Sequence, residues 1–285
     1  MIYVSTGGYK DLAFEDTIKE LSKVGIVAFE LSGGKFSYDV HKRLKTLSET
    51  YAIALHNYFP PPKTPFVLNL ASFRDDIVQA SMSHITHAID LSHSIGAKFY
   101  GFHAGYLIDP RVSELGAKIT KKVVNDRRKA LDYFVARASK LAAYAEGKGV
   151  KLLVENNVLS SANYSSFGEN PLLMVDEDET HEIMNRSHNN LGLLIDVAHL
   201  KVSANTLGFS AVDYLNNFYD SVSAYHFSDN LGLEDSNDEI TEESWFWPYI
   251  NKGLDYYSLE IYNIPERTQS QQLRLVSKIL RPQRV

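Results

Sequence analysis

The sequence of 285 residues contains no cysteine. Disulfides, metal sites built on thiolates and a cysteine nucleophile are therefore excluded. The chain also lacks an uninterrupted apolar run of the ~18–20 residues that a membrane-spanning helix needs. Its start, MIYVSTGGYK, lacks the basic segment and the long apolar stretch of a secretory signal. We therefore expect a soluble, cytoplasmic protein without a membrane partner.

The chain also lacks an excess of positive charge, since its formal net charge is −6. Basic residues gather in KKVVNDRRK (121–129), but this stretch is typical of the exposed face at the start of a helix. No basic stripe suited to the phosphate backbone of a nucleic acid is apparent. Nucleic acid is accordingly not the expected partner.

Short apolar runs alternate with longer amphipathic segments along the whole chain. Each run is rich in Ile, Val, Leu, Tyr or Phe and is bounded by turn residues, as is typical of buried strands. The eight runs span residues 2–8, 26–34, 52–59, 98–105, 150–157, 191–199, 221–230 and 257–263. Helical periodicity covers 15–24, 38–51, 74–97, 124–149, 171–187 and 266–280, whereas 231–250 shows no regular pattern.

Strands that alternate with helices predict parallel pairing through right-handed crossovers. An open, doubly wound sheet would also satisfy this order. However, the runs have similar lengths and none resembles an edge strand, which favours a closed barrel. A length of 285 residues and a hydrophobic content of 44% suit one large core. We therefore predict an α/β protein, a single (β/α)8 TIM barrel that spans residues 1–285.

Ionisable side chains occur where six consecutive runs end. In a barrel of parallel strands the carboxyl ends meet at one rim, so these groups are expected to converge. Taken singly, each is better explained as a helix cap, a partner for an arginine or a hydrogen-bonded core histidine than as a metal ligand. The residues are His56, His103, Glu155, Asp196 followed by His199, His226 followed by Asp229, and Glu260.

A buried charge such as Asp196 is costly unless a counterion pairs with it. Carboxylates brought together without a cation would repel one another and take up protons. Imidazole and carboxylate ligands together suit Mn²⁺, Zn²⁺ or Co²⁺, whereas a set of oxygens alone would suit Mg²⁺ or Ca²⁺. We therefore predict a divalent metal at this rim. His199 would bind it directly or hold a substrate oxygen.

Four of these residues and their neighbours resemble the xylose isomerase-like TIM barrels. They are Glu155 in LLVENN, Asp196 in LLIDVAH, His226 in AYHFSDN and Glu260 in SLEIYN. In the D-tagatose 3-epimerase and inosose dehydratase branches, four such residues hold one divalent metal, usually Mn²⁺ or Co²⁺. The D-x-x-H of Asp196 and His199 is also shared. The resemblance thus implies that these four residues are metal ligands.

The resemblance also implies a reaction on a sugar or a sugar phosphate. Glu155 and Glu260 would exchange protons with opposite faces of the substrate through an enediolate, which gives an epimer or an isomer. An inosose dehydratase-like lyase is a further alternative, and a sugar-binding barrel without turnover is another. Relatives commonly form dimers or tetramers, so the resemblance allows for a homo-oligomer.

A second branch, the endonuclease IV family of apurinic-site nucleases, has the same barrel and three zinc ions. Its first zinc site resembles His56 in LHNYF, His103 in FHAGY and Glu155. Its third site does not match, because Trp245 and Trp247 stand where an Asp and a His are expected. This branch implies a zinc phosphodiesterase, with one or two metals per chain, as the alternative function.

Residues that would bind the substrate are predicted from their chemistry and their place on the rim. Sugars stack on aromatic faces, so Tyr58, Trp245 and Trp247 are candidates, although plain packing explains each tryptophan equally well. Asp229, just beyond the seventh strand, is a further candidate. The epimerases often have an arginine six residues after the seventh-strand histidine, and this chain has Gly232 there.

Overall fold

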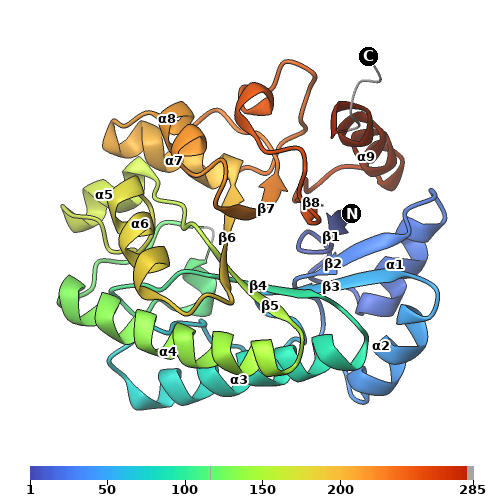
Figure 1. Ribbon diagram of the computed structural model, residues 1–285, viewed down its shortest axis with the longest axis horizontal. Coiled ribbons are helices and arrows are strands. Elements are labelled where there is room, and N and C mark those ends of the chain that lie inside the picture. Colours follow the sequence, from blue (N-terminus) through green and yellow to red (C-terminus); the bar gives the residue numbers. More distant parts are fainter. Residues whose placement is uncertain (116, 281–285) are drawn as a thin grey trace.

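The computed structural model describes residues 1–115 and 117–280. Its strands are all parallel and close into a barrel in chain order, with the first strand paired to the last (Figure 1). This confirms the closed barrel and excludes the open sheet. The strands are β1 (Ile2–Ser5), β2 (Ala28–Leu31), β3 (Ala52–His56), β4 (Phe99–His103), β5 (Lys151–Glu155), β6 (Leu191–Asp196), β7 (Val222–Phe227) and β8 (Tyr257–Leu259).

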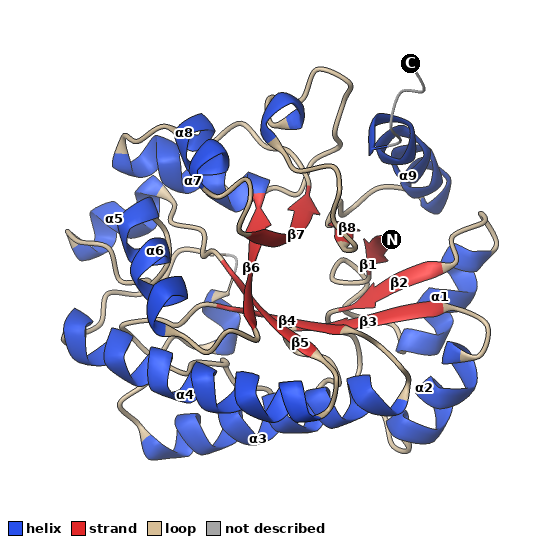
Figure 2. Cartoon of the chain, in the orientation of Figure 1, coloured by secondary structure: helices blue, strands red, loops and turns tan. Residues whose placement is uncertain are grey.

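Helices surround the ring of strands (Figure 2). Two long helices, α3 (Asp75–Ser94) and α4 (Arg127–Gly147), pack against each other along one side. The other helices are α1 (Phe14–Ser22), α2 (Val40–Ser48), α5 (Ser161–Phe167), α6 (Glu177–Arg186), α7 (Val197–Leu207), α8 (Ala211–Asn217) and α9 (Glu266–Leu280). Within the described ranges, none of these helices has the length and apolar character needed to cross a bilayer.

Three helices, α5, α7 and α8, were not predicted from the sequence. The run 191–199 resembles one strand, but β6 ends at Asp196 and α7 begins at the next residue. The Asp196 carboxylate accepts hydrogen bonds from the backbone N–H groups of Ala198 and His199, which makes it the N-cap of α7. The other two helices have seven residues each, too few to show a clear helical period.

Side-chain alternation along the strands separates two apolar regions. On β5, Leu152 and Val154 face the surrounding helices, whereas Leu153 and Glu155 face the barrel interior. A small apolar layer fills the interior, made by Ala54, Leu153, Leu194, Ala224 and Tyr256 with Tyr3 and Phe99 packed against it. Except for Gly101 on β4, the next inward-facing positions toward the carboxyl ends are polar. The fold thus places the ionisable residues directly above a dry layer.

Long segments at the carboxyl ends of the strands cover the mouth of the barrel. The connection from β4 to α4 contains the 3-10 turn η1 (Val112–Glu114), and the one from β7 to β8 contains η2 (Trp247–Tyr249). The latter connection is the segment without a regular pattern in the sequence. It folds back on itself through backbone hydrogen bonds between Asp229 and Asp238.

Candidate metal centre

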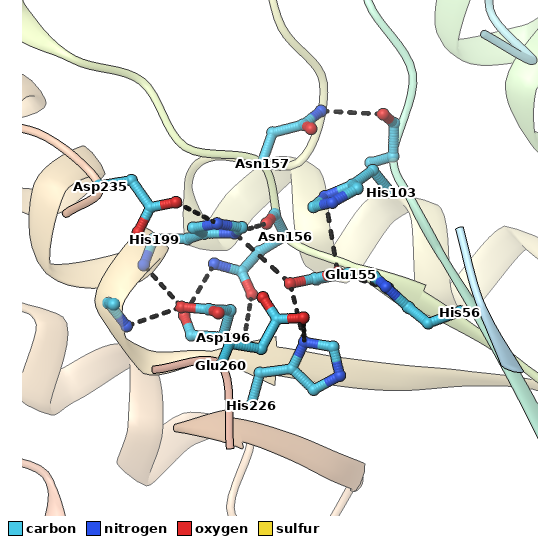
Figure 3. A network of polar contacts seen from close by, with 12 residues as sticks. His56, His103, Glu155, Asn156, Asn157, Asp196, His199, His226, Asp235 and Glu260 are labelled. Atoms are coloured by element: carbon cyan, nitrogen blue, oxygen red, sulfur yellow. Dashed lines mark hydrogen bonds and ion pairs between the residues drawn. The ribbon is translucent and has the colours of Figure 1, made fainter. Parts of the chain in front are cut away.

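Glu155, the last residue of β5, lies at the centre of the polar layer and is fully buried. Its Oε2 is 2.9 Å from His56 Nε2 and 3.5 Å from His103 Nδ1. Its Oε1 is 3.3 Å from His226 Nδ1 and 3.5 Å from His199 Nδ1 (Figure 3). Histidines from β3, β4, β7 and the first turn of α7 therefore surround one carboxylate, as the shared rim of the strands predicts.

A group of four residues brings its ligand atoms closest to a metal-binding arrangement. Atoms of Glu155, Asp196, His226 and Glu260 all lie within 4.8 Å of one another, and all four residues are buried. Figure 3 shows them pointing toward a common centre. The set contains three carboxylates and one imidazole, a donor set that suits Mn²⁺, Co²⁺ or Zn²⁺.

Three buried atoms in this group have no hydrogen-bond partner, which supports the binding of a cation between them. Glu155 Oε1, Asp196 Oδ2 and His226 Nδ1 are buried and make no hydrogen bond. A buried polar atom without a partner costs about 1–3 kcal/mol, and more if it is charged. Because these three atoms belong to the same group of four residues, one divalent ion would satisfy all of them. The residues therefore fit a divalent metal.

The electrostatics of the group show how its charges balance without a metal. Burial raises the pKa of Asp196 to about 7, and the charge of Glu155 adds to this shift. Burial would also raise the pKa of Glu155, but the charge of His226 and the hydrogen bond from His56 hold it well below its ordinary value. Burial would lower the pKa of His226, yet the carboxylates around it raise that pKa well above its ordinary value. Protons thus occupy sites that a metal would take.

The histidines predicted as ligands of a second metal lie in different groups. His56 shares one group with Glu155 and His226 and another with Glu30 and Glu260, whereas His103 shares a third with Glu155 and His199. Burial lowers the pKa of His103 to about 4, so its imidazole is neutral and able to bind a metal or a substrate. His56 needs the space beside Gly101, where a Cβ atom would lie 2.6 Å from the imidazole Cδ2.

Sequence reasoning missed three polar residues that hold this site. The side-chain oxygen of Asn156 accepts a hydrogen bond from the Asp196 backbone N–H at 2.8 Å, which ties the ends of β5 and β6 together. Asp235 Oδ2 lies 3.2 Å from His199 Nε2. Glu30, on β2, contacts His226. Asp235 gave no signal because its segment has no period. Glu30 did give one, since it is a charged residue within the apolar stretch AFEL.

The predicted substrate-binding residues have the following surroundings. The Tyr58 hydroxyl accepts a hydrogen bond from the Leu68 backbone N–H, and Trp247 is buried with its Nε1 donating to the Thr241 carbonyl. The Asp229 carboxylate accepts hydrogen bonds from Lys201 Nζ and Ser244 Oγ. Trp245 is half-buried, and its Nε1 has no partner. Contacts of this kind explain the packing of Tyr58, Trp247 and Asp229, and the sugar contacts of all four stay predictions.

Comparison with known proteins identifies the fold. The family model described as xylose isomerase-like TIM barrel matches residues 18–259, whereas no curated protein matches the sequence. A D-tagatose 3-epimerase-like protein superposes with a TM-score of 0.71 at 20% identity, covering 98% of this chain and 96% of that one. The 3-keto-D-glucoside 4-epimerase of E. coli has a TM-score of 0.68 at 10% sequence identity, and the match covers 97% of this chain and 98% of that one. A Thermus thermophilus protein soaked with ZnCl2 has a TM-score of 0.58 at 15% sequence identity, and the match covers 97% of this chain and 98% of that one.

We expect the affinity of the four-residue group for Zn²⁺ to rise with pH. Below its raised pKa of about 7 Asp196 holds a proton, and His226 must also lose the proton on Nδ1 before it can bind a metal. Each displaced proton changes the affinity by about tenfold per pH unit. Competition with a chromophoric chelator between about pH 6 and 8 measures the slope. Asp196→Asn should remove the contribution of one proton to the slope below about pH 7, where the wild-type carboxyl is protonated. A pH-independent wild-type affinity would contradict this account.

Proposed function

Because the chain belongs to the xylose isomerase-like TIM barrel family, we propose that it is a divalent-metal-dependent isomerase or epimerase of sugars. The observation that carries the proposal is the buried group of Glu155, Asp196, His226 and Glu260, with its three orphaned ligand atoms. Two of the similar solved structures are, by name, an epimerase and an epimerase-like protein, which supports the same class of reaction. The substrate would be a carbohydrate with a carbonyl group next to a hydroxyl-bearing carbon.

The four residues would hold the metal, and each glutamate of the set has a second task. When bound, a divalent metal supplies a Lewis acid that acidifies the C–H between the carbonyl and the hydroxyl. Glu155 stays ionised among the imidazoles, which suits it to accept the proton from that carbon. Burial raises the pKa of Glu260, which suits it to carry a proton and deliver it to the enediolate. Delivery to the opposite face inverts the centre. Delivery to the neighbouring carbon, together with transfer of the hydroxyl proton to the former carbonyl oxygen, isomerises the sugar.

Ser5 holds Glu260 in place at the rim. Its Oγ donates a hydrogen bond of 3.1 Å to Glu260 Oε1, and it also contacts the hydroxyls of Ser32 and Tyr262. Tyr262 in turn packs against Gly7, where a Cβ atom would lie 2.2 Å from the phenol oxygen. A fixed carboxylate reaches the substrate carbon without the entropic cost of ordering a mobile side chain.

A zinc phosphodiesterase of the endonuclease IV kind is the second candidate. His56 and His103 both approach the same oxygen of Glu155, which favours a second metal beside the first. Trp245 and Trp247 argue against this function, because an indole cannot bind zinc in place of the aspartate and histidine of the third zinc site. One metal per chain favours the epimerase, and two favour the phosphodiesterase.

Chelation followed by dialysis should abolish the activity, and Mn²⁺, Co²⁺ or Zn²⁺ should restore it. The reloaded protein is assayed in parallel on a panel of ketoses, on inososes and on abasic DNA, with metal content measured in the same samples. We expect turnover of a ketose. Dehydration of an inosose would assign the lyase alternative, and nicking of abasic DNA the phosphodiesterase. Full turnover by metal-free protein would contradict the mechanism.

Glu260→Gln should retain the fold and lose at least ~10³-fold in kcat, because general acid–base steps contribute about 10²–10⁴. Glu243→Gln is the matched control, since Glu243 is an exposed glutamate on the segment between β7 and β8. Circular dichroism verifies the fold of both variants, and single-turnover kinetics measures the rate. A Glu260→Gln enzyme with a near wild-type rate would remove Glu260 from the chemistry.

A further inference from the structure

Glu30 is a buried carboxylate that the proposed chemistry does not use. It lies on β2 within AFEL, faces the barrel interior and has no exposed surface. Oε2 accepts hydrogen bonds from His226 Nε2 at 2.9 Å and from the Tyr256 hydroxyl, and Oε1 accepts one of 3.0 Å from Ser258 Oγ. These donors make Glu30 an acceptor at both oxygens, as suits an ionised carboxylate.

The contact with Glu30 determines which nitrogen of His226 faces the metal group. Donation from Nε2 to Glu30 fixes a proton on Nε2, so Nδ1 is the nitrogen whose proton a metal would displace. Nδ1 lies 3.3 Å from Glu155 Oε1 and 3.6 Å from Glu260 Oε1, and it makes no hydrogen bond. The ring therefore presents Nδ1 to the carboxylates that the metal would share.

Glu30 differs from the ligand group in how its oxygens are used. Glu155 Oε1 and Asp196 Oδ2 are orphaned, whereas both oxygens of Glu30 already have donors. Tyr256 packs on Tyr3 in the apolar layer below, with ring centroids 4.9 Å apart, so the donors to Glu30 are themselves held in place. Glu30 thus contacts the ligand His226 but offers no free oxygen to a metal.

We propose that Glu30 is a positioning residue that fixes the tautomer and the ring orientation of His226, so that the histidine binds metal through Nδ1. The inference rests on the proposed function in that His226 must be a metal ligand. A carboxylate behind a ligating histidine increases the basicity of the ligand, and loss of such a partner typically costs 10–100-fold in metal affinity.

The first test needs no variant of Glu30. Protein labelled with ¹⁵N-histidine is loaded with Zn²⁺, and the ring correlations of His226 are assigned by their loss in His226→Asn. We expect zinc on Nδ1 and the proton on Nε2. Binding of zinc through Nε2 would overturn the inference. A wild-type protein that binds no metal would contradict the proposed function itself.

The second test compares Glu30→Gln, which keeps the shape of the side chain and removes its charge, with Glu49→Gln, which makes the same change at an exposed glutamate away from the site. Chelator competition should show a zinc affinity about 10–100-fold lower for Glu30→Gln and close to wild type for Glu49→Gln. The d–d spectrum of the Co²⁺ form should change only in Glu30→Gln. Wild-type affinity in a folded Glu30→Gln protein would overturn the role of Glu30 while leaving the metal site intact. If that variant fails to fold, Glu30→Asp, which keeps the charge but withdraws it from His226, takes its place in both measurements. Wild-type affinity in a folded Glu30→Asp protein would equally overturn the role of Glu30.

Discussion

The arrangement of the site follows from the free energy that is lost when carboxylates are buried without a counterion. Glu155 is fully buried and has four imidazoles within 3.5 Å, while Asp196 and Glu260 share the same space. In the absence of metal, protons spread over the histidines and Asp196 balance this charge. A divalent cation would balance the charge more effectively, because it would bind all of the orphaned ligand atoms. The proposed chemistry uses the same property, since a charge developing on the substrate is stabilised where charges are already concentrated.

The fold of the barrel holds the residues that surround these charged groups. Tyr3, Phe99 and Tyr256 belong to the dry layer beneath the polar groups, and this layer keeps water from reaching them from below. Asn156 ties adjacent strands together at the level of the ligands, and Glu30 holds the imidazole of His226 from behind. The ligands lie at or next to the ends of strands that are hydrogen-bonded to both neighbours. A substrate would therefore meet groups that the barrel already brings together.

Much of this arrangement could be predicted from the sequence, because strand ends of a parallel barrel share one rim. From sequence position alone, that rule predicts that Glu155, Asp196, His226 and Glu260 lie together. It could not predict which oxygen faces which imidazole, since that depends on rotamers. Glu30 was missed although the rule on buried charge applies to it, because it precedes the end of its strand by one residue. Asp235 reaches His199 only through tertiary folding of an aperiodic segment.

The most direct test of the central claim is a crystal structure of the protein grown with Mn²⁺ or Co²⁺, with anomalous diffraction recorded at the absorption edge of the metal. The account predicts one strong anomalous peak inside the barrel, at about 2.0–2.3 Å from Glu155, Asp196, His226 and Glu260. A second peak beside His103 would extend the site without removing its centre. An interior without a peak, or a metal bound away from these four residues, would contradict the account.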